Sequence, residues 1–220
     1  MRKLAILIII PVLFLLACSN GNTKNYNNNS AISGEQIDKS IIQNGDIIFQ
    51  TSKSRQSKAI QLATKSKYSH IGIIYKKANA YYVFEAVQPV KLTKLDKWIK
   101  RGEGGKYVIK RLKNAKTILT ADKLSKMKKI GNKFMGKNYD LYFEWSDKKI
   151  YCSELVWKVY KRALGIEIGK LEKLEDFDLS NKIVRKKLEE RYGKNIPMDE
   201  LVISPAAIYN SNKLVSVFEN

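Results

Sequence analysis

Two apolar stretches separated by a short polar turn constrain the fold of this chain more than any other feature. Residues 71–75 and 81–87 are rich in β-branched and aromatic side chains, and a turn at 77–79 lies between them. This pattern predicts an antiparallel β-hairpin. In the register that we expect, His70 lies opposite Glu85 of the second strand, with both side chains on one face of the sheet.

The rest of the chain predicts a mixture of helices and short strands. Further strands are expected at 47–50, 107–112 and 213–218. The spacing of apolar residues and the capping residues predict helices at 35–44, 54–65, 95–101, 120–135, 150–164 and 182–192, with a short helix beginning at Ser204-Pro205. Because the strands are antiparallel and the helices segregate from them, the predicted class is α+β.

The N-terminus has the features of an export signal. Arg2 and Lys3 precede an apolar run at 4–16, which is too short to span a bilayer. The run ends in Leu-Leu-Ala and then Cys18, which resembles a bacterial lipobox. We therefore expect a signal peptide at 1–17, removed before a lipidated Cys18, and a protein anchored to a membrane of the cell envelope on its extracytoplasmic side. The alternative is an ordinary signal peptide followed by a chance cysteine.

The residues after Cys18 are polar and rich in asparagine, so they cannot bury apolar surface. We expect a flexible tether over 18–35, followed by a single domain over 36–220. That length is enough for one hydrophobic core.

The chain is strongly basic, with a formal net charge of +20, two units of which leave with the signal peptide. The lysines are spread through the sequence, and no nucleic-acid-binding motif is present, so no nucleic-acid partner is expected. A basic protein held at a membrane attracts lipid headgroups and anionic envelope polymers. A lysine-rich face that is merely solvated explains the composition equally well.

Chemistry is concentrated in one histidine and one cysteine. The chain has a single histidine, His70, and once Cys18 is lipidated its only free thiol is Cys152. Cys152 lies at the predicted start of a helix, where the helix dipole and a nearby imidazolium would stabilise a thiolate. Taken alone, Cys152 would more often be a buried structural residue. Its combination with the sole histidine in an exported chain favours a catalytic pair.

Glu85 is the predicted third member of this site. A carboxylate beside an imidazole fixes its tautomer and stabilises the imidazolium. Glu85 interrupts an otherwise apolar strand, and a charge there needs a partner. The alternative is a glutamate on an edge strand that faces solvent.

Several of these segments together resemble a known family. They are Gly45-Asp46-Ile47-Ile48-Phe49, Tyr68-Ser69-His70-Ile71-Gly72-Ile73, Phe84-Glu85-Ala86, Tyr139-Asp140 and Tyr151-Cys152-Ser153-Glu154-Leu155. Over about 45–212 the chain is similar to the YiiX/YebB-like branch of the NlpC-type cysteine hydrolases. The resemblance implies a circularly permuted papain-like fold, in which a small antiparallel sheet packs on the helix that carries the nucleophile. It also implies Cys152 as nucleophile, His70 as base and Glu85 as orienting residue.

The implied reaction is cleavage of an amide through an acyl-enzyme. The backbone N–H of Cys152 would supply part of the oxyanion hole. Tyr68 or Tyr151 is a candidate for a further donor, and packing is the favoured alternative for both. No metal or other cofactor is expected, because one histidine and one cysteine far apart in sequence do not match zinc-ligand spacing.

Three functions stay open from the sequence. The first is an envelope-anchored cysteine amidase or peptidase acting on cell-wall peptide or an N-acyl amide. The second is a lipid esterase or acyltransferase on the same fold. The third is a catalytically idle surface lipoprotein that binds anionic envelope polymers.

Overall fold

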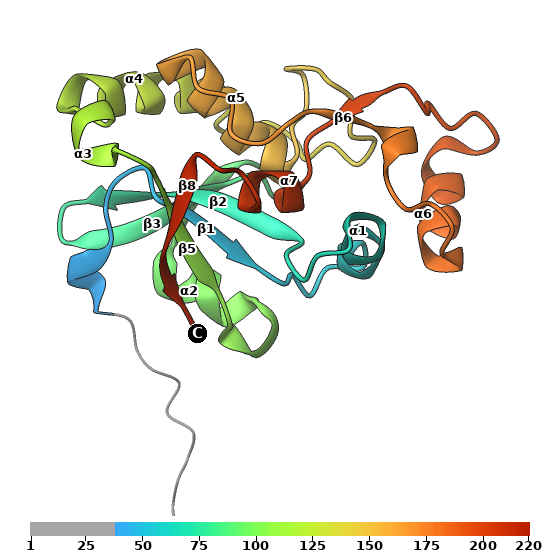
Figure 1. Ribbon diagram of the computed structural model, residues 1–220, viewed down its shortest axis with the longest axis horizontal. Helices are drawn as coiled ribbons and strands as arrows, with labels where there is room; N and C mark the ends of the chain where they lie inside the picture. Colours follow the sequence, from blue (N-terminus) through green and yellow to red (C-terminus); the bar gives the residue numbers. More distant parts are fainter. Residues whose placement is uncertain (1–37) are drawn as a thin grey trace, which may run out of the picture. The chain divides into compact units, whose positions relative to one another are not determined.

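The computed structural model describes residues 38–220 (Figure 1). Six strands form one antiparallel sheet in the order β4-β3-β2-β1-β5-β8. These strands are β1 (Ile47–Gln50), β2 (His70–Lys77), β3 (Ala80–Glu85), β4 (Lys91–Lys94), β5 (Val108–Leu112) and β8 (Leu214–Glu219). Two short strands, β6 (Glu172–Lys173) and β7 (Leu201–Val202), pair separately with each other.

Seven α-helices are found in the described part of the chain. They are α1 (Ser57–Thr64), α2 (Leu95–Arg101), α3 (Ala115–Ile118), α4 (Ala121–Asn132), α5 (Cys152–Leu164), α6 (Lys182–Tyr192) and α7 (Pro205–Tyr209). Short 3₁₀ turns occur at Lys39–Ile41, Glu103–Gly105 and Leu174–Asp176. The predicted α+β class is confirmed. Across residues 38–220, no helix is both long and apolar enough to cross a membrane.

Helix α5 covers one face of the sheet, with α4 beside it (Figure 1). Ile71 and Ile73 of β2 point to this face and share a buried core with Leu155, Val156 and Val159 of α5. The apolar spacing along α5 gives it one buried stripe, and Gly165 ends it in the left-handed conformation with φ 75°. This packing fixes the first turn of α5 against the start of β2.

Helix α2 covers the opposite face. The alternate residues of the strands, such as Ile74 and Val83, pack there with Leu95 and Trp98 of α2. Because side chains alternate along a strand, His70 belongs to the same face as Ile74. His70 therefore approaches from the α2 side of the sheet, whereas Cys152 begins a helix on the other side.

The predicted hairpin is confirmed, but its expected register was wrong by two residues. Lys77 pairs with Ala80, so the loop is the dipeptide Ala78-Asn79, and Gly72 rather than His70 comes level with Glu85. Ala78 adopts a positive φ of 51°, which allows the chain to reverse within two residues. A shift of two residues keeps every side chain on its face, so His70 and Glu85 stay on one face as diagonal neighbours.

Most other predicted elements are present with ends moved by a few residues. The helix predicted at 182–192 has the predicted bounds, whereas the one predicted at 35–44 is only a 3₁₀ turn at Lys39–Ile41 within the described residues. Strand β4 and helix α3 were not predicted, because the residues of β4 are mostly exposed and α3 is a single turn. The predicted signal peptide, Cys18 and the tether over 18–35 lie outside the described residues.

Candidate active site

Cys152 is the first residue of α5 and is almost fully buried. The helix starts there because Tyr151 is extended, and the Glu154 side chain accepts a hydrogen bond from the Tyr151 N–H at 3.4 Å. Ser153 donates its hydroxyl to the Ile203 carbonyl at 2.7 Å, which ties the first turn of α5 to the segment before α7. As the first helical residue, Cys152 has a backbone N–H with no intrahelical acceptor, and that group is free to stabilise an oxyanion.

His70, the first residue of β2, lies between Cys152 and Glu85. Its Nε2 is 2.6 Å from Glu85 Oε2, and the Cys152 thiol is near enough to raise the pKa of the ring. The indole of Trp98 stacks on the imidazole with ring centroids 5.9 Å apart. The structure thus brings the three predicted residues into one chain of contacts.

Glu85 is fully buried and accepts hydrogen bonds from four side chains. Besides His70, Trp98 Nε1 donates to it at 2.9 Å and Thr93 Oγ1 at 2.6 Å, while Arg101 forms an ion pair with the same carboxylate. This excludes the alternative of a solvent-facing edge glutamate. Sequence reasoning did not foresee Thr93, Trp98 or Arg101 here, because they come from the unpredicted strand β4 and from a helix whose facing direction was unknown.

The environment of Glu85 keeps it ionised. Burial by itself would raise the pKa of this carboxyl, but the hydrogen bonds and positive charges of His70 and Arg101 outweigh burial and lower the pKa to about 2. The favourable interaction is complete above the ordinary glutamate pKa and is lost only as the pH falls through about 2. Glu85 is therefore an anion throughout the neutral range, and in this form it holds His70.

Cys152 and His70 stabilise each other's charged forms. Burial would raise the pKa of the Cys152 thiol, but the hydrogen bond and charge of His70, with the backbone N–H groups of Ile71 and Ser153, lower it below its ordinary value. Burial would likewise lower the pKa of His70, yet Cys152 and Glu85 together raise it to about 9. The pair is poised as thiolate and imidazolium.

The two tyrosines considered as oxyanion donors are both engaged elsewhere. The Tyr151 hydroxyl accepts a hydrogen bond from the Ile203 N–H at 3.1 Å. The Tyr68 hydroxyl donates to Glu219 Oε1 at 3.3 Å, and its ring packs against Tyr209 with centroids 4.4 Å apart. These contacts favour the packing role that was the alternative for both residues.

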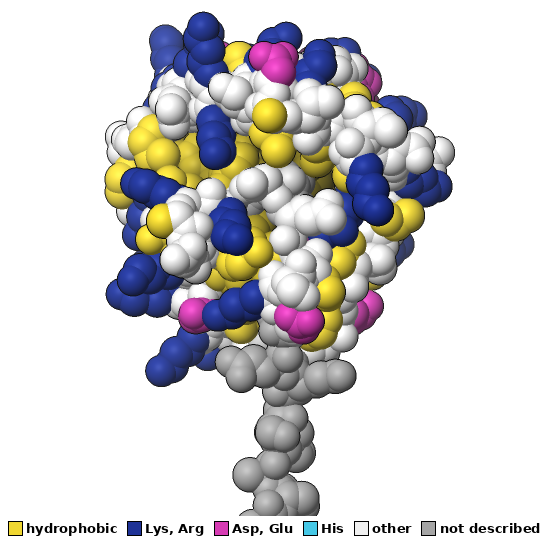
Figure 2. All heavy atoms as spheres, turned by 90° about the vertical axis from the view of Figure 1, so that its left-hand side faces the viewer, with side chains coloured by type: hydrophobic (Ala, Val, Ile, Leu, Met, Phe, Trp, Pro, Cys, Tyr) yellow, Lys and Arg dark blue, Asp and Glu magenta, His cyan; other side chains and the backbone are white. Residues whose placement is uncertain are grey.

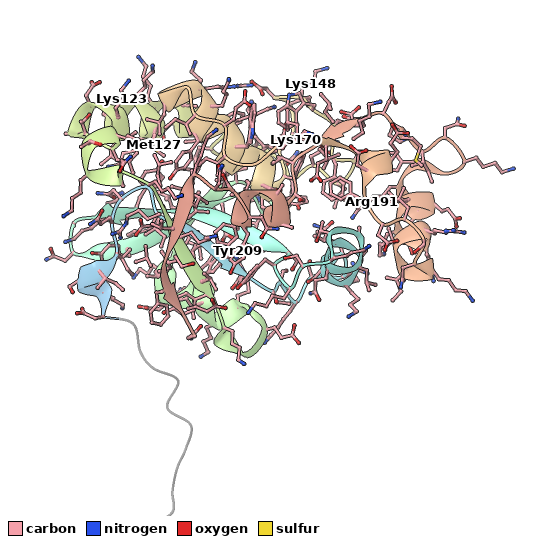
Figure 3. All side chains as sticks on the ribbon, in the orientation of Figure 1. Lys123, Met127, Lys148, Lys170, Arg191 and Tyr209 are labelled. Carbon is pink, nitrogen blue, oxygen red and sulfur yellow. The ribbon has the colours of Figure 1, made fainter. Side chains whose placement is uncertain are left out.

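Tyr139 is a site residue that sequence reasoning missed. Its hydroxyl accepts a hydrogen bond from Gln56 Nε2 at 2.9 Å and lies near enough to Cys152 for that group to raise its pKa. Burial and the charge of Cys152 raise the pKa of Tyr139 well above its ordinary value, so the hydroxyl keeps its proton. Arg191, which belongs to α6, donates a hydrogen bond to Gln56 Oε1 at 2.6 Å. Figure 3 shows Arg191 between α6 and α1. The Tyr139-Asp140 pair upstream of the cysteine was the one available signal.

Metal-ligating side chains do not gather in the described part of the chain. Residues 38–220 contain no group of three or more His, Cys, Asp or Glu side chains placed to hold a metal ion. Cys152 and His70 supply two such donors, and the oxygens of Glu85 are already occupied by the four donors above. This donor set does not fit a metal centre.

Comparison with known proteins agrees with this geometry. Residues 41–218 match the family model described as permuted papain-like amidase enzyme, YaeF/YiiX, C92 family. The chain is 51% identical over 175 residues to the uncharacterized protein YiiX of Escherichia coli K12, covering 80% of this chain and 85% of that protein. It is also similar to the crystal structure of the metalloprotein YiiX from Escherichia coli O157:H7, with a TM-score of 0.77, 51% identity, and coverage of 81% of this chain and 97% of the other. The chain therefore belongs to the permuted papain-like amidases, a family of cysteine hydrolases.

Proposed function

We propose that the protein is an envelope amidase in which Cys152 is the nucleophile, His70 the acid and base, and Glu85 the residue that orients His70. The observation that carries this proposal is the 2.6 Å contact between His70 Nε2 and Glu85 Oε2, with Cys152 near enough to the same ring to raise its pKa. A thiolate needs a base, and the base needs a fixed orientation. No other histidine exists in the chain to serve these roles.

The first half of the reaction forms the acyl-enzyme. The Cys152 thiolate attacks the carbonyl carbon of the amide, and the negative charge that develops on oxygen is met by the Cys152 backbone N–H. Because Glu85 occupies Nε2, the other ring nitrogen of His70 delivers its proton to the leaving nitrogen. The C–N bond breaks, a thioester forms, and the amine departs neutral.

The second half returns the enzyme to its starting state. A water molecule gives a proton to the now neutral His70 and attacks the thioester carbon. The C–S bond breaks, the carboxylic acid is released, and Cys152 leaves as thiolate beside the imidazolium. Tyr139 donates a hydrogen bond toward the sulfur and helps to hold the thiolate in place.

A metal has no part in this proposal. The Escherichia coli O157:H7 relative is described as a metalloprotein, but the donors of this chain do not fit a metal centre.

Replacing Glu85 separates the effect of its charge from that of its shape. We expect Glu85→Gln to lower kcat less than Glu85→Ala, because glutamine keeps the size and a hydrogen-bond acceptor but loses the charge that stabilises the imidazolium. The thiol pKa of Cys152, read from the pH dependence of its alkylation rate, should rise in both variants. If Glu85→Ala keeps both the wild-type kcat and the wild-type thiol pKa of Cys152, Glu85 has no role in the mechanism.

We propose that Cys18 carries the lipid anchor, which would place the domain at an envelope membrane. Radiolabelled palmitate should enter the wild-type protein in its host and should be absent from Cys18→Ser, because the thiol is the site of the thioether. Cys152→Ser is the matched control and should label like the wild type. Equal labelling of Cys18→Ser and the wild type would rule the anchor out.

Binding to anionic envelope polymers is the second candidate role. Figure 2 shows one face of the molecule on which lysine and arginine side chains outnumber acidic ones. This surface would hold the enzyme near an anionic layer by a salt-sensitive attraction. It can act together with catalysis, and the buried ion pairs around His70 serve no purpose in a protein that only binds polymers.

A further inference from the structure

A groove with both basic and apolar walls lies away from the catalytic residues. It is formed where the end of β2 and β3 meets β4 and the last turns of α4, and it encloses about 920 Å³ of space, part of it open to solvent. None of Cys152, His70 and Glu85 lines it. The groove is therefore separate from the site described above, and its own composition has to indicate what it binds.

The segments that meet at this groove carry positive charge only. Residues 71–84, 86–95 and 123–139 contain two, two and six lysines respectively, and no aspartate or glutamate. Lys76, Lys77 and Lys128 line the groove, and their side chains are exposed. Among the described residues none of these three lysines has a carboxylate partner. A surface of this kind attracts an anionic partner.

Two large apolar side chains are exposed among these lysines. Leu92 is 39% exposed and Met135 is 40% exposed, and both line the groove. Figure 2 shows apolar side chains between lysines on the face that carries α4 and the end of the β2–β3 hairpin, which is the left-hand side of Figure 1. Apolar side chains flanked by lysines are typical of a surface that lies in the interfacial layer of an anionic bilayer. A soluble polyanion would contact the lysines but would leave Leu92 and Met135 in water.

The groove also has a buried polar group without a partner. Tyr75 lines the groove and is 6% exposed, and its hydroxyl has no hydrogen-bond partner among residues 38–220. A buried hydroxyl that makes no hydrogen bond costs free energy, so such a group points to a ligand. Lys128 Nζ lies 5.8 Å from the centre of the Tyr75 ring. A phosphate in the groove would accept a hydrogen bond from Tyr75 and would be attracted by Lys128.

From these observations we propose that the groove binds the phosphate of an anionic phospholipid, and that the surface around it docks the protein on a membrane with Leu92 and Met135 in the interfacial layer. The proposal goes beyond the amidase function and does not depend on it, because no catalytic residue takes part. It also holds with or without a lipid on Cys18. Together with such an anchor, the groove would decide which face of the domain lies against the bilayer.

The first test is sedimentation of the full chain with vesicles, in a Cys18→Ser background so that no acyl chain contributes. One set of vesicles is phosphatidylcholine alone, and the other is an equal mixture with phosphatidylglycerol. The neutral vesicles measure any binding that does not depend on lipid charge. We expect tighter binding to the anionic vesicles, and this difference should shrink as salt is added. Equal binding to both kinds of vesicle would overturn the proposal, while the cysteine chemistry would be untouched.

Neutralising the three lysines of the groove tests the location. The triple variant Lys76→Gln, Lys77→Gln, Lys128→Gln should bind the anionic vesicles on the order of a hundredfold more weakly, at about fivefold per lysine. The matched control changes to glutamine three exposed lysines in or next to α6, at the other end of the molecule in Figure 1, which are Lys182, Lys186 and Lys194. An unchanged rate of Cys152 alkylation shows that a variant is folded. Equal weakening by the two triple variants would mean that binding follows net charge alone, and the groove would be ruled out.

The apolar side chains distinguish a bilayer from an anionic polymer. Leu92→Ser and Met135→Ser should each weaken binding to the anionic vesicles about fivefold, because serine has little apolar surface to remove from water. Val215→Ser is the control, since Val215 is 43% exposed on β8, at the opposite edge of the sheet from β4, and it should bind like the parent protein. If the serine variants also bind like the parent while the lysine variant does not, the surface binds a polyanion and the membrane proposal is wrong.

Removing the unpartnered hydroxyl tests whether a phosphate lies in the groove. Tyr75→Phe should weaken binding to the anionic vesicles about tenfold. Its thermal midpoint should be no lower than that of the parent protein, because the hydroxyl that is lost makes no hydrogen bond within the described chain. Parent-like vesicle binding by Tyr75→Phe would show that no phosphate is bound there.

Fluorescence quenching measures which side chains reach the bilayer. Met135→Trp should be quenched by phosphatidylglycerol with brominated acyl chains more strongly than the parent protein, whereas Lys194→Trp should be quenched no more than the parent. Equal quenching of the two variants would contradict the proposed orientation on the membrane.

Discussion

Cys152→Ala is expected to abolish turnover, by a factor on the order of 10⁶ in kcat, because no other side chain in the site can form the acyl-enzyme. The measurement is release of amine from N-acyl amides and muropeptides by the purified variant. Cys152 is buried and alanine is smaller, so the thermal midpoint should be measured in parallel.

The control for this variant is a matched loss of volume elsewhere. Val159→Ala removes buried side-chain atoms from the same helix, away from the site, and should keep kcat while lowering stability. If Cys152→Ala retains turnover while folded, the nucleophile assignment is wrong. If Val159→Ala loses kcat as severely, the effect of Cys152→Ala reports helix packing rather than chemistry.

His70 should give kcat/KM a bell-shaped pH dependence, and His70→Ala should lower kcat by about 10²–10⁴-fold. Activity should rise as the Cys152 thiol ionises, with an apparent pKa below that of an ordinary thiol, and fall as the imidazolium loses its proton near pH 9. These apparent values belong to the coupled pair. An alkylation rate that reports an ordinary thiol pKa in the wild type, unchanged in His70→Ala, would refute the ion pair.

The raised pKa of His70 also affects how the stability of the fold depends on pH. The pKa of His70 is raised from 6.5 to about 9 on folding. A raised histidine pKa contributes stability that is fully present below about pH 6.5 and is lost as the pH rises through about 9. In the wild type the lowered thiol pKa of Cys152 opposes this decline over the same window, because the unfolded thiol still carries the proton that the folded thiolate lacks. Chemical denaturation of Cys152→Ala, in which Glu85 still raises the pKa of His70, should therefore show the decline more clearly than the wild type, and the double variant with His70→Ala should lose it.

The chemistry of the site was more predictable than its surroundings. His70, Glu85 and Cys152 could be predicted to lie together because each stands out locally. His70 is the sole histidine, Glu85 is a charge within an apolar strand, and Cys152 is a thiol at a helix start. Even the wrong register of the hairpin kept His70 and Glu85 in contact, because side chains alternate with a period of two.

The partners of these residues depend on long-range packing, which local patterns do not report. Arg101 and Trp98 reach Glu85 only because α2 packs across the sheet in one orientation. Tyr139 meets Cys152 through an irregular segment, held by the bridge between Tyr139 and Ile150. An apolar pocket beside Cys152 likewise has walls from α1 and α6, which are more than a hundred residues apart in the chain.

Glu85 depends for most of its support on one contiguous segment. Thr93 belongs to β4, and Trp98 and Arg101 belong to the helix that directly follows it. Strand β4 is an edge strand of the sheet, paired on one side only. Edges open more readily than sheet centres, so local unfolding of 91–101 would free the carboxylate while the rest of the core stays folded. The site can therefore be lost at a smaller cost in free energy than global unfolding requires. Hydrogen exchange of the backbone amides in 91–101 is where this loss would first be seen.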